Sequence, residues 1–169
     1  MNKKTKMPPN LTQEKMNDFS YIIGIDPDNC KSGIAIHNPK EKYLETKSLS
    51  FFELFDYLRE NKENIKLIKI EGGWLNKKSN FRFAKSQSIG EKMARDVGAN
   101  HETGKKIIEM CEYLNIEYKV VKPLQKNWRG SGKKITDVEL RRILFGMGIT
   151  FNQKRTNQDN RDSVLICLF

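Results

Sequence analysis

Four acidic residues occur in contexts from which their carboxylates can meet. Asp26 and Glu71 each come directly after an apolar run of strand length. Asp159 and Asp162 are three residues apart, a spacing that puts both on one face of a helix. Carboxylates this close repel one another unless they share a proton, gain a cationic partner or bind a metal. Mg²⁺ prefers oxygen ligands, so the four acids predict a site for divalent metal ions.

Three of these acids also have ordinary structural explanations. Asp26 begins a D-P-D-N segment, which is typical of a turn. Asp159 follows Thr156 by three residues, so it can support a helix N-terminus through capping and the helix dipole, and Asp162 can serve the same helix start. Glu71 ends a buried strand and precedes two glycines, where an acid has no evident structural purpose. The metal-site hypothesis therefore depends most on Glu71 beside Asp26.

The elements that must position the acids follow from hydrophobic patterning. Apolar runs rich in β-branched residues predict strands over 21–25, 32–37, 43–48, 66–70 and 117–121. Helical periodicity and capping-box spacings predict helices over about 50–58, from the end of a loop at 72–84 to about 114, over 136–146, and from about 156 onward.

The order of these elements predicts an α/β fold with a five-stranded mixed sheet. The first three strands form an antiparallel meander, the fourth and fifth run parallel to the first, and helices cover both faces. This is the order of an RNase H-like fold. The crossover helix permits strands 21–25 and 66–70 to be neighbours, which would put their ends ~5 Å apart, so that Asp26 and Glu71 face one point.

Length and charge set the general class. The chain has 169 residues, which fits one domain, and its net charge of +10 favours a polyanionic partner such as nucleic acid. Residues 1–18 are polar and Lys-rich and are predicted to be a flexible basic arm, with 19–169 as the folded domain. Three distant cysteines suit a reducing compartment, and no apolar run can span a membrane or serve as a signal peptide. We therefore expect a cytoplasmic, unexported protein of a bacterium or a phage-infected cell.

Several short motifs together resemble a known enzyme family. In order they are G-I-D-P at 24–27 with S-G-x-A at 32–35, I-E at 70–71, V-G-A at 97–99, K-P at 122–123 and D-x-x-D-S at 159–163. Their order and spacing are similar to those of the RuvC group of Holliday-junction resolvases, and more to its compact phage-type members than to the cellular enzyme. The resemblance covers about residues 21–169, and Ser163 replaces the family's usual alanine.

The resemblance implies a function for the four acids. Asp26, Glu71, Asp159 and Asp162 match the carboxylates that hold two Mg²⁺ ions, for which Mn²⁺ would substitute. The implied reaction is in-line phosphodiester hydrolysis that leaves a 5′ phosphate and a 3′ hydroxyl. The implied substrate is a four-way DNA junction, and its two-fold symmetry calls for a homodimer with two sites. Glycines 98 and 104 would allow close helix contact, either with a second subunit or with the protein's own sheet.

Basic and aromatic residues supply candidate DNA contacts. By the resemblance, Lys126 and Lys134 are the lysines nearest to those that assist catalysis at the scissile phosphate, and Trp74 corresponds to an aromatic that enters the opened junction. The remaining candidates for DNA binding are basic residues of the loop at 72–84 and of the segment after the strand at 117–121. They are Lys77, Lys78, Arg82, Lys122, Arg129 and Lys133. The structural alternatives are that the basic run is simply solvated and that Trp74 belongs to the hydrophobic core.

Two other functions are also compatible with the sequence. One is an RNase H-like nuclease that acts on other branched or hybrid nucleic acids. The other is a catalytically silent DNA-binding module that keeps the fold. Sugar-kinase-like ATPases share the strand order, but the chain has neither a second Gly-rich phosphate hairpin nor room for a second lobe.

Overall fold

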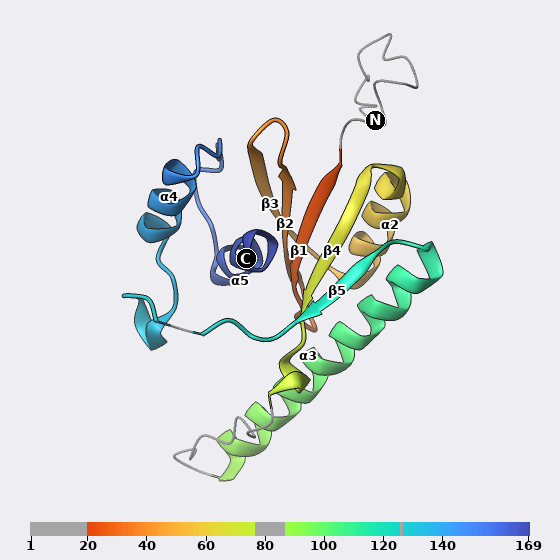
Figure 1. The fold of residues 1–169 in the computed structure, drawn as a ribbon. Coiled ribbons are helices and arrows are strands. Elements are labelled where there is room, and N and C mark those ends of the chain that lie inside the picture. The colour runs from red at the N-terminus through yellow and green to blue at the C-terminus, as the bar shows by residue number, and fades with distance from the viewer. Residues whose placement is uncertain (1–19, 77–86, 126) are drawn as a thin grey trace, which may run out of the picture.

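The computed structural model describes residues 20–76, 87–125 and 127–169 (Figure 1). The predicted basic arm at 1–18 lies outside the described residues.

A five-stranded sheet with the order β3-β2-β1-β4-β5 forms the centre of the molecule. β1 pairs antiparallel with β2, and β2 pairs antiparallel with β3. β4 is parallel to β1, and β5 is parallel to β4. The predicted meander and the two parallel strands are thus confirmed. The strand bounds are β1 Tyr21–Asp26, β2 Ser32–Asn38, β3 Tyr43–Leu49, β4 Ile65–Glu71 and β5 Tyr118–Val121.

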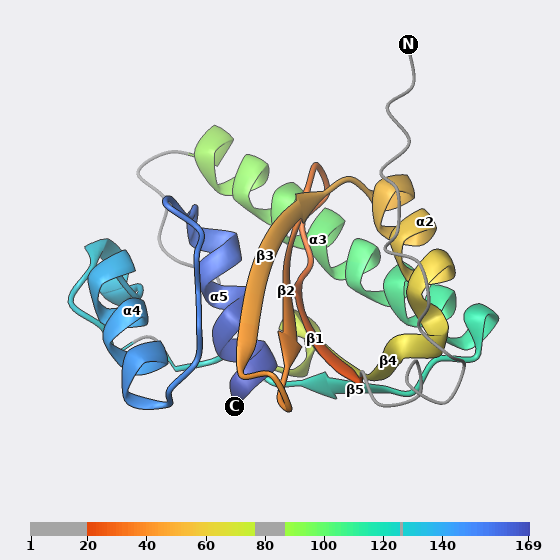
Figure 2. The ribbon, with the colours of Figure 1, turned by 90° about the horizontal axis from the view of Figure 1, so that it is seen from above.

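Helices cover both faces of the sheet, as predicted (Figures 1 and 2). α2 (Phe51–Asn61) and the long α3 (Gln87–Leu114) lie on one face, and α5 (Gln158–Leu168) lies on the other, between the sheet and α4 (Asp137–Gly146). Short 3₁₀ turns occupy Lys62–Asn64, Gly73–Leu75 and Ser131–Lys133, so the predicted loop at 72–84 begins with one such turn. None of the described helices is long and apolar enough to cross a bilayer.

The two faces of β1 explain how the chain builds its core. Ile23 and Ile25 are fully buried against the helices on the α2–α3 face. Gly24 points to the opposite face, because side chains alternate along a strand. A Cβ on Gly24 would lie 2.3 Å from the backbone oxygen of Ser163, so α5 contacts the sheet backbone to backbone there. Gly33 on β2 has the same role for the first turn of α5, where a Cβ would lie 2.3 Å from the backbone oxygen of Asp159.

The starts of α2 and α4 have the predicted capping boxes. The Glu53 carboxylate accepts a hydrogen bond of 2.8 Å from the Ser50 backbone N–H. Thr136 accepts from the Glu139 backbone N–H at 3.2 Å. The last helix differs, since it begins at Gln158 and its cap is Asn157.

The later start of α5 has a local cause. The Thr156 hydroxyl donates to the Asp137 carboxylate at 2.7 Å, so it is not the helix cap. The Asn157 side chain instead accepts from the Asn160 backbone N–H at 2.7 Å. The predicted helix start near Thr156 is therefore displaced by two residues. Asp159 lies in the first turn of α5 without being the partner of a Thr156 cap.

Candidate active site

Asp26 and Glu71 end adjacent parallel strands. Ile25 pairs with Ile70 in the β1–β4 register, so the acid that follows each isoleucine comes at the same edge of the sheet. Neighbouring strands are ~4.8 Å apart, which puts the two residues side by side, as the sequence predicted. β4 ends at Glu71, the Gly72 N–H still donates to the Val121 carbonyl at the end of β5 at 2.8 Å, and the 3₁₀ turn at Gly73–Leu75 follows.

Both acids line one cleft, with a volume of about 700 Å³. One wall is the half of α3 that extends past the end of the sheet, and it contributes Met93, Asn100 and His101. The opposite wall comes from the segment after β5, with Pro123 at one point and Lys133 at another. The cleft is therefore lined by carboxylates at the strand ends, by an apolar and amide-bearing helix face, and by at least one lysine.

The other two acids belong to the start of α5. Asp159 lies over Gly33 of β2 and is half-buried, and Asp162 is half-buried one turn later. Burial raises the pKa of Asp159, and the nearby carboxylates of Asp28 and Asp162 raise it further, against the opposing effects of Lys134 and Arg161. The start of α5 is thus a place where negative charge is only partly compensated by the protein itself.

The chemistry of these donors suits a hard divalent cation. Among the described residues, no three acidic, histidine or cysteine side chains are close enough together to form a ready metal shell. Mg²⁺ does not need one, because it is commonly held by one or two carboxylates with water and substrate phosphate as the remaining ligands. Asp26 and Glu71 could hold such an ion in the cleft, and Asp159 with Asp162 offer carboxylates that a cation would stabilise.

The predicted basic residues divide into three groups. Lys134 is near enough to Asp159 to act on its pKa, and Lys133 lines the cleft. Lys122 is exposed just after β5, and Arg129 is exposed while its backbone N–H donates to Glu139 at 3.1 Å. Lys77, Lys78, Arg82 and Lys126 lie outside the described residues.

Trp74 packs against the protein's own long helix. A Cβ on Gly104 would lie 2.6 Å from the Trp74 ring, and the ring meets His101 edge-on at 6.0 Å between centroids. The indole is half-buried. Gly104 of α3 therefore accommodates an aromatic of this chain, whereas Gly98 has no atom within 4 Å of a built Cβ.

Sequence reasoning missed two residues that shape the cleft. The Asn100 side chain donates to Asp28 at 3.3 Å and accepts from the Asn29 backbone N–H at 3.0 Å, which ties the turn after Asp26 to α3. His101 lines the cleft and lies against Gly73, where a Cβ would be 2.7 Å from its Nε2. No local motif marks either residue, because Asn100 contacts Asn29, 71 positions earlier, and His101 contacts Gly73, 28 positions earlier.

The raised pKa of Asp159 leads to a test of stability against pH. Its folded pKa lies above the unfolded value near 3.9, so ionising it costs stability, and this cost is absent below about pH 4 and grows as the pH rises through the folded pKa. We expect Asp159→Asn to raise the Tm at pH 7 in metal-free buffer, with a gain that shrinks toward pH 4. Thermal unfolding followed by circular dichroism measures it. The exposed Asp56→Asn is the control, and a variant less stable than wild type at pH 7 would contradict the charge argument.

The strand order and the helices on both faces are those of an RNase H-like fold, as the sequence predicted. The sequence matches no protein-family model and no curated protein. The structure is similar to that of Thermus thermophilus RuvC in complex with a Holliday junction substrate, with a TM-score of 0.51 and 13% identity over 88% of this chain and 90% of that chain. A second structure of Thermus thermophilus RuvC gives a TM-score of 0.47 at the same 13% identity, over 88% of this chain and 91% of that one.

Proposed function

We propose that this protein is a Mg²⁺-dependent endodeoxyribonuclease that resolves four-way DNA junctions by paired nicks. The observation that carries the proposal is the pair Asp26 and Glu71, side by side at the ends of parallel strands and open to one cleft. The fold is shared with a RuvC whose solved complex contains a Holliday junction substrate. A net charge of +10 suits a DNA partner.

The protein's own groups would act on the scissile phosphate from two sides. Asp26 and Glu71 would hold cations from the strand ends, and Asp159 and Asp162 would add carboxylates from α5. When bound there, divalent cations would supply activation of the attacking water and neutralisation of charge on the leaving 3′ oxygen. Lys134, already close to Asp159, brings positive charge next to these carboxylates, where a phosphate oxygen would bind. The products are a 5′ phosphate and a 3′ hydroxyl.

Selection of a junction over linear duplex would require contacts beyond the carboxylates. Trp74 packs on α3 and remains partly exposed, so its indole can stack on an unpaired base at the junction centre, a contact that contributes ~1–3 kcal/mol per base. A homodimer supplies two sites for the two strands that must be cut. Lys122, Arg129 and Lys133 would contact the phosphate backbone of the arms.

Cleavage of an end-labelled synthetic four-way junction tests the proposal. With Mg²⁺ we expect paired nicks, placed symmetrically across the junction, because a symmetric dimer applies the same site to both strands. Linear duplex of the same sequence should be cut at least ~10²-fold more slowly, since it cannot offer an opened centre to stack on, and a loss of ~3 kcal/mol of binding corresponds to that factor. Sequencing gels map the nicks, and single-turnover rates give the ratio.

Two results would count against this function. Equal rates on linear and four-way DNA would contradict junction selectivity and favour a nuclease for other nucleic acids. Junction binding without any cleavage in Mg²⁺ or Mn²⁺ would favour a catalytically silent binding module.

A further inference from the structure

The carboxylate of Asp162 is held by a neighbouring amide. The Gln158 Nε2 donates to the Asp162 Oδ1 at 2.7 Å, across one turn of α5. The other end of the same amide accepts from Arg161, whose Nη2 lies 3.0 Å from the Gln158 Oε1. A guanidinium has only donors, so the amide oxygen must face Arg161 and the NH₂ group must face the acid. Arg161 thereby fixes which end of Gln158 meets Asp162.

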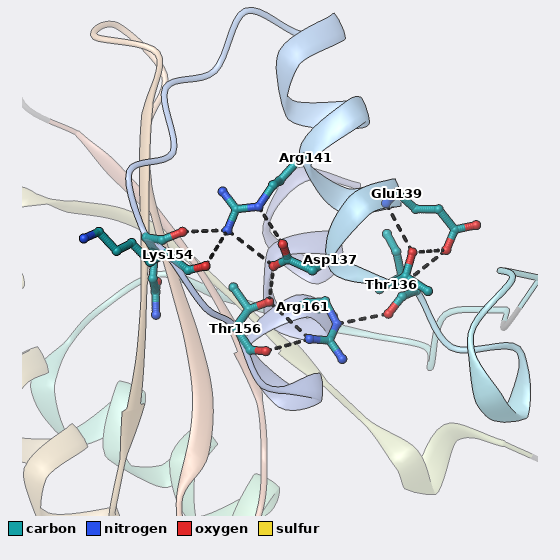
Figure 3. Close-up of polar contacts among 9 residues, drawn as sticks. Thr136, Asp137, Glu139, Arg141, Lys154, Thr156 and Arg161 are labelled. Carbon is teal, nitrogen blue, oxygen red and sulfur yellow. Dashed lines mark hydrogen bonds and ion pairs between the residues drawn. The ribbon is translucent and has the colours of Figure 1, made fainter.

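Arg161 is itself anchored outside the helix turn that it serves (Figure 3). Its Nε donates to the Ile135 carbonyl at 3.0 Å, just before α4. Its Nη1 donates to the Thr156 carbonyl at 2.7 Å and to the Thr156 hydroxyl at 3.1 Å. The guanidinium therefore reaches the segments that precede α4 and α5, as well as Gln158, and has little freedom to rotate.

The anchor continues into α4. The Thr156 hydroxyl donates to the Asp137 Oδ1 at 2.7 Å, and Arg141 donates to the Asp137 Oδ2 at 2.6 Å. Burial works to raise the pKa of Asp137, but the hydrogen bonds from Arg141 and Thr156 outweigh it and hold that pKa below its ordinary value. Arg141 also donates to the Gln153 carbonyl at 2.6 Å. A continuous chain of charged and polar contacts thus runs from α4 to the Asp162 carboxylate.

We infer that Gln158 is a positioning residue for the cation-binding carboxylate of Asp162, and that Arg161 holds Gln158 in the orientation this requires. The inference rests on the proposed function, because it assigns Asp162 to the metal site. A hydrogen bond to one carboxylate oxygen restricts the rotation of the carboxylate and so fixes the direction in which the other oxygen points. Partners of this kind typically change metal affinity by ~10- to 100-fold when they are removed. An i,i+4 pair with no role beyond the helix would add slightly to helix stability and would leave metal binding unchanged.

The test is direct titration with Mn²⁺, with the free ion followed by electron paramagnetic resonance in the absence of DNA. We expect Gln158→Met to weaken Mn²⁺ binding ~10-fold or more while the Tm stays within about 2 °C of wild type, because Met keeps the length and helix preference of Gln without its donor. Arg161→Lys keeps the charge but loses the fork, so it should weaken Mn²⁺ binding to a smaller degree. The Mg²⁺ concentration for half-maximal junction cleavage should rise most in Gln158→Met and less in Arg161→Lys.

The chain offers a matched control for this substitution. Gln153 is also half-buried and near α4, but its Oε1 accepts from the Thr46 backbone N–H at 3.2 Å on β3. Gln153→Met should leave Mn²⁺ affinity unchanged. Gln158→Met with Mn²⁺ affinity within about two-fold of wild type would overturn the positioning role and leave the proposed function standing. A wild-type protein that binds no Mn²⁺ would overturn the proposed metal site and the positioning role with it.

Discussion

Replacement of Glu71 by glutamine is expected to reduce junction cleavage by ~10³-fold or more, equivalent to ~4 kcal/mol of transition-state stabilisation, and to leave junction binding intact. The substitution keeps the size of the side chain at the end of β4, so the cleft keeps its shape. It removes a negative oxygen ligand, and a neutral amide is a much weaker ligand for Mg²⁺. Single-turnover cleavage gives the rate, and a mobility-shift titration in EDTA gives the junction affinity.

Glu63→Gln is the matched control for this variant. Glu63 is 86% exposed in the 3₁₀ turn after α2, and its substitution changes the net charge by the same amount. Any gain in DNA affinity that comes from removing one negative charge will appear in both variants. Cleavage should be lost only in Glu71→Gln. Full activity in Glu71→Gln would place the chemistry elsewhere, and loss of binding together with cleavage would show that Glu71 acts in folding or DNA contact.

Gly33→Ala is expected to damage both stability and activity through one added methyl group. The new Cβ would lie 2.3 Å from the Asp159 backbone oxygen and 2.4 Å from its carbonyl carbon, so backbone must move. Overpacking of this kind costs ~3 kcal/mol, which corresponds to a fall in Tm of ~6–12 °C for a domain of this size. The displaced turn carries Asp159, and a shift of ~1 Å at a reacting group can cost ~10²-fold in rate.

Chemical denaturation and cleavage assays below the lowered Tm separate the two effects. Gly146→Ala is the control, because a Cβ there has no atom within 4 Å and alanine favours a helix by up to ~1 kcal/mol. We expect Gly146→Ala to be as stable as wild type or slightly more stable. A Gly33→Ala protein with wild-type Tm and cleavage would contradict the close contact between α5 and β2.

The sequence was sufficient to predict the sheet and to place Asp26 and Glu71 at the ends of two of its strands. Apolar runs ending at Asp26 and Glu71 located two strand ends, and the crossover helix permitted those strands to be parallel neighbours, which they are in the structure. These are local signals combined with a strong topological preference. The capping boxes at Ser50 and Thr136 were equally local and were also confirmed.

Longer-range polar contacts could not be read in the same way. Thr156 has the right spacing for a capping box with Asp159, yet its hydroxyl binds Asp137, a residue 19 positions earlier. Asp28 looks like a turn residue, and it is one, since it accepts from the Cys30 N–H at 2.8 Å. It also meets Asn100 on α3, 72 positions away. Such pairings depend on how helices are placed against the sheet, which no periodicity encodes.

The glycine contacts of α5 give the two faces of the sheet different tolerance to sequence change. On the α2–α3 side, apolar side chains fill a layer that can be repacked with other side chains of similar volume. On the α5 side, at Gly24 and Gly33, no side chain intervenes between helix and sheet, so neither position can vary without moving the helix. Drift in sequence can therefore be extensive on one face while the acids on α5 keep their places, and a common architecture can persist at an identity as low as the 13% found with a RuvC.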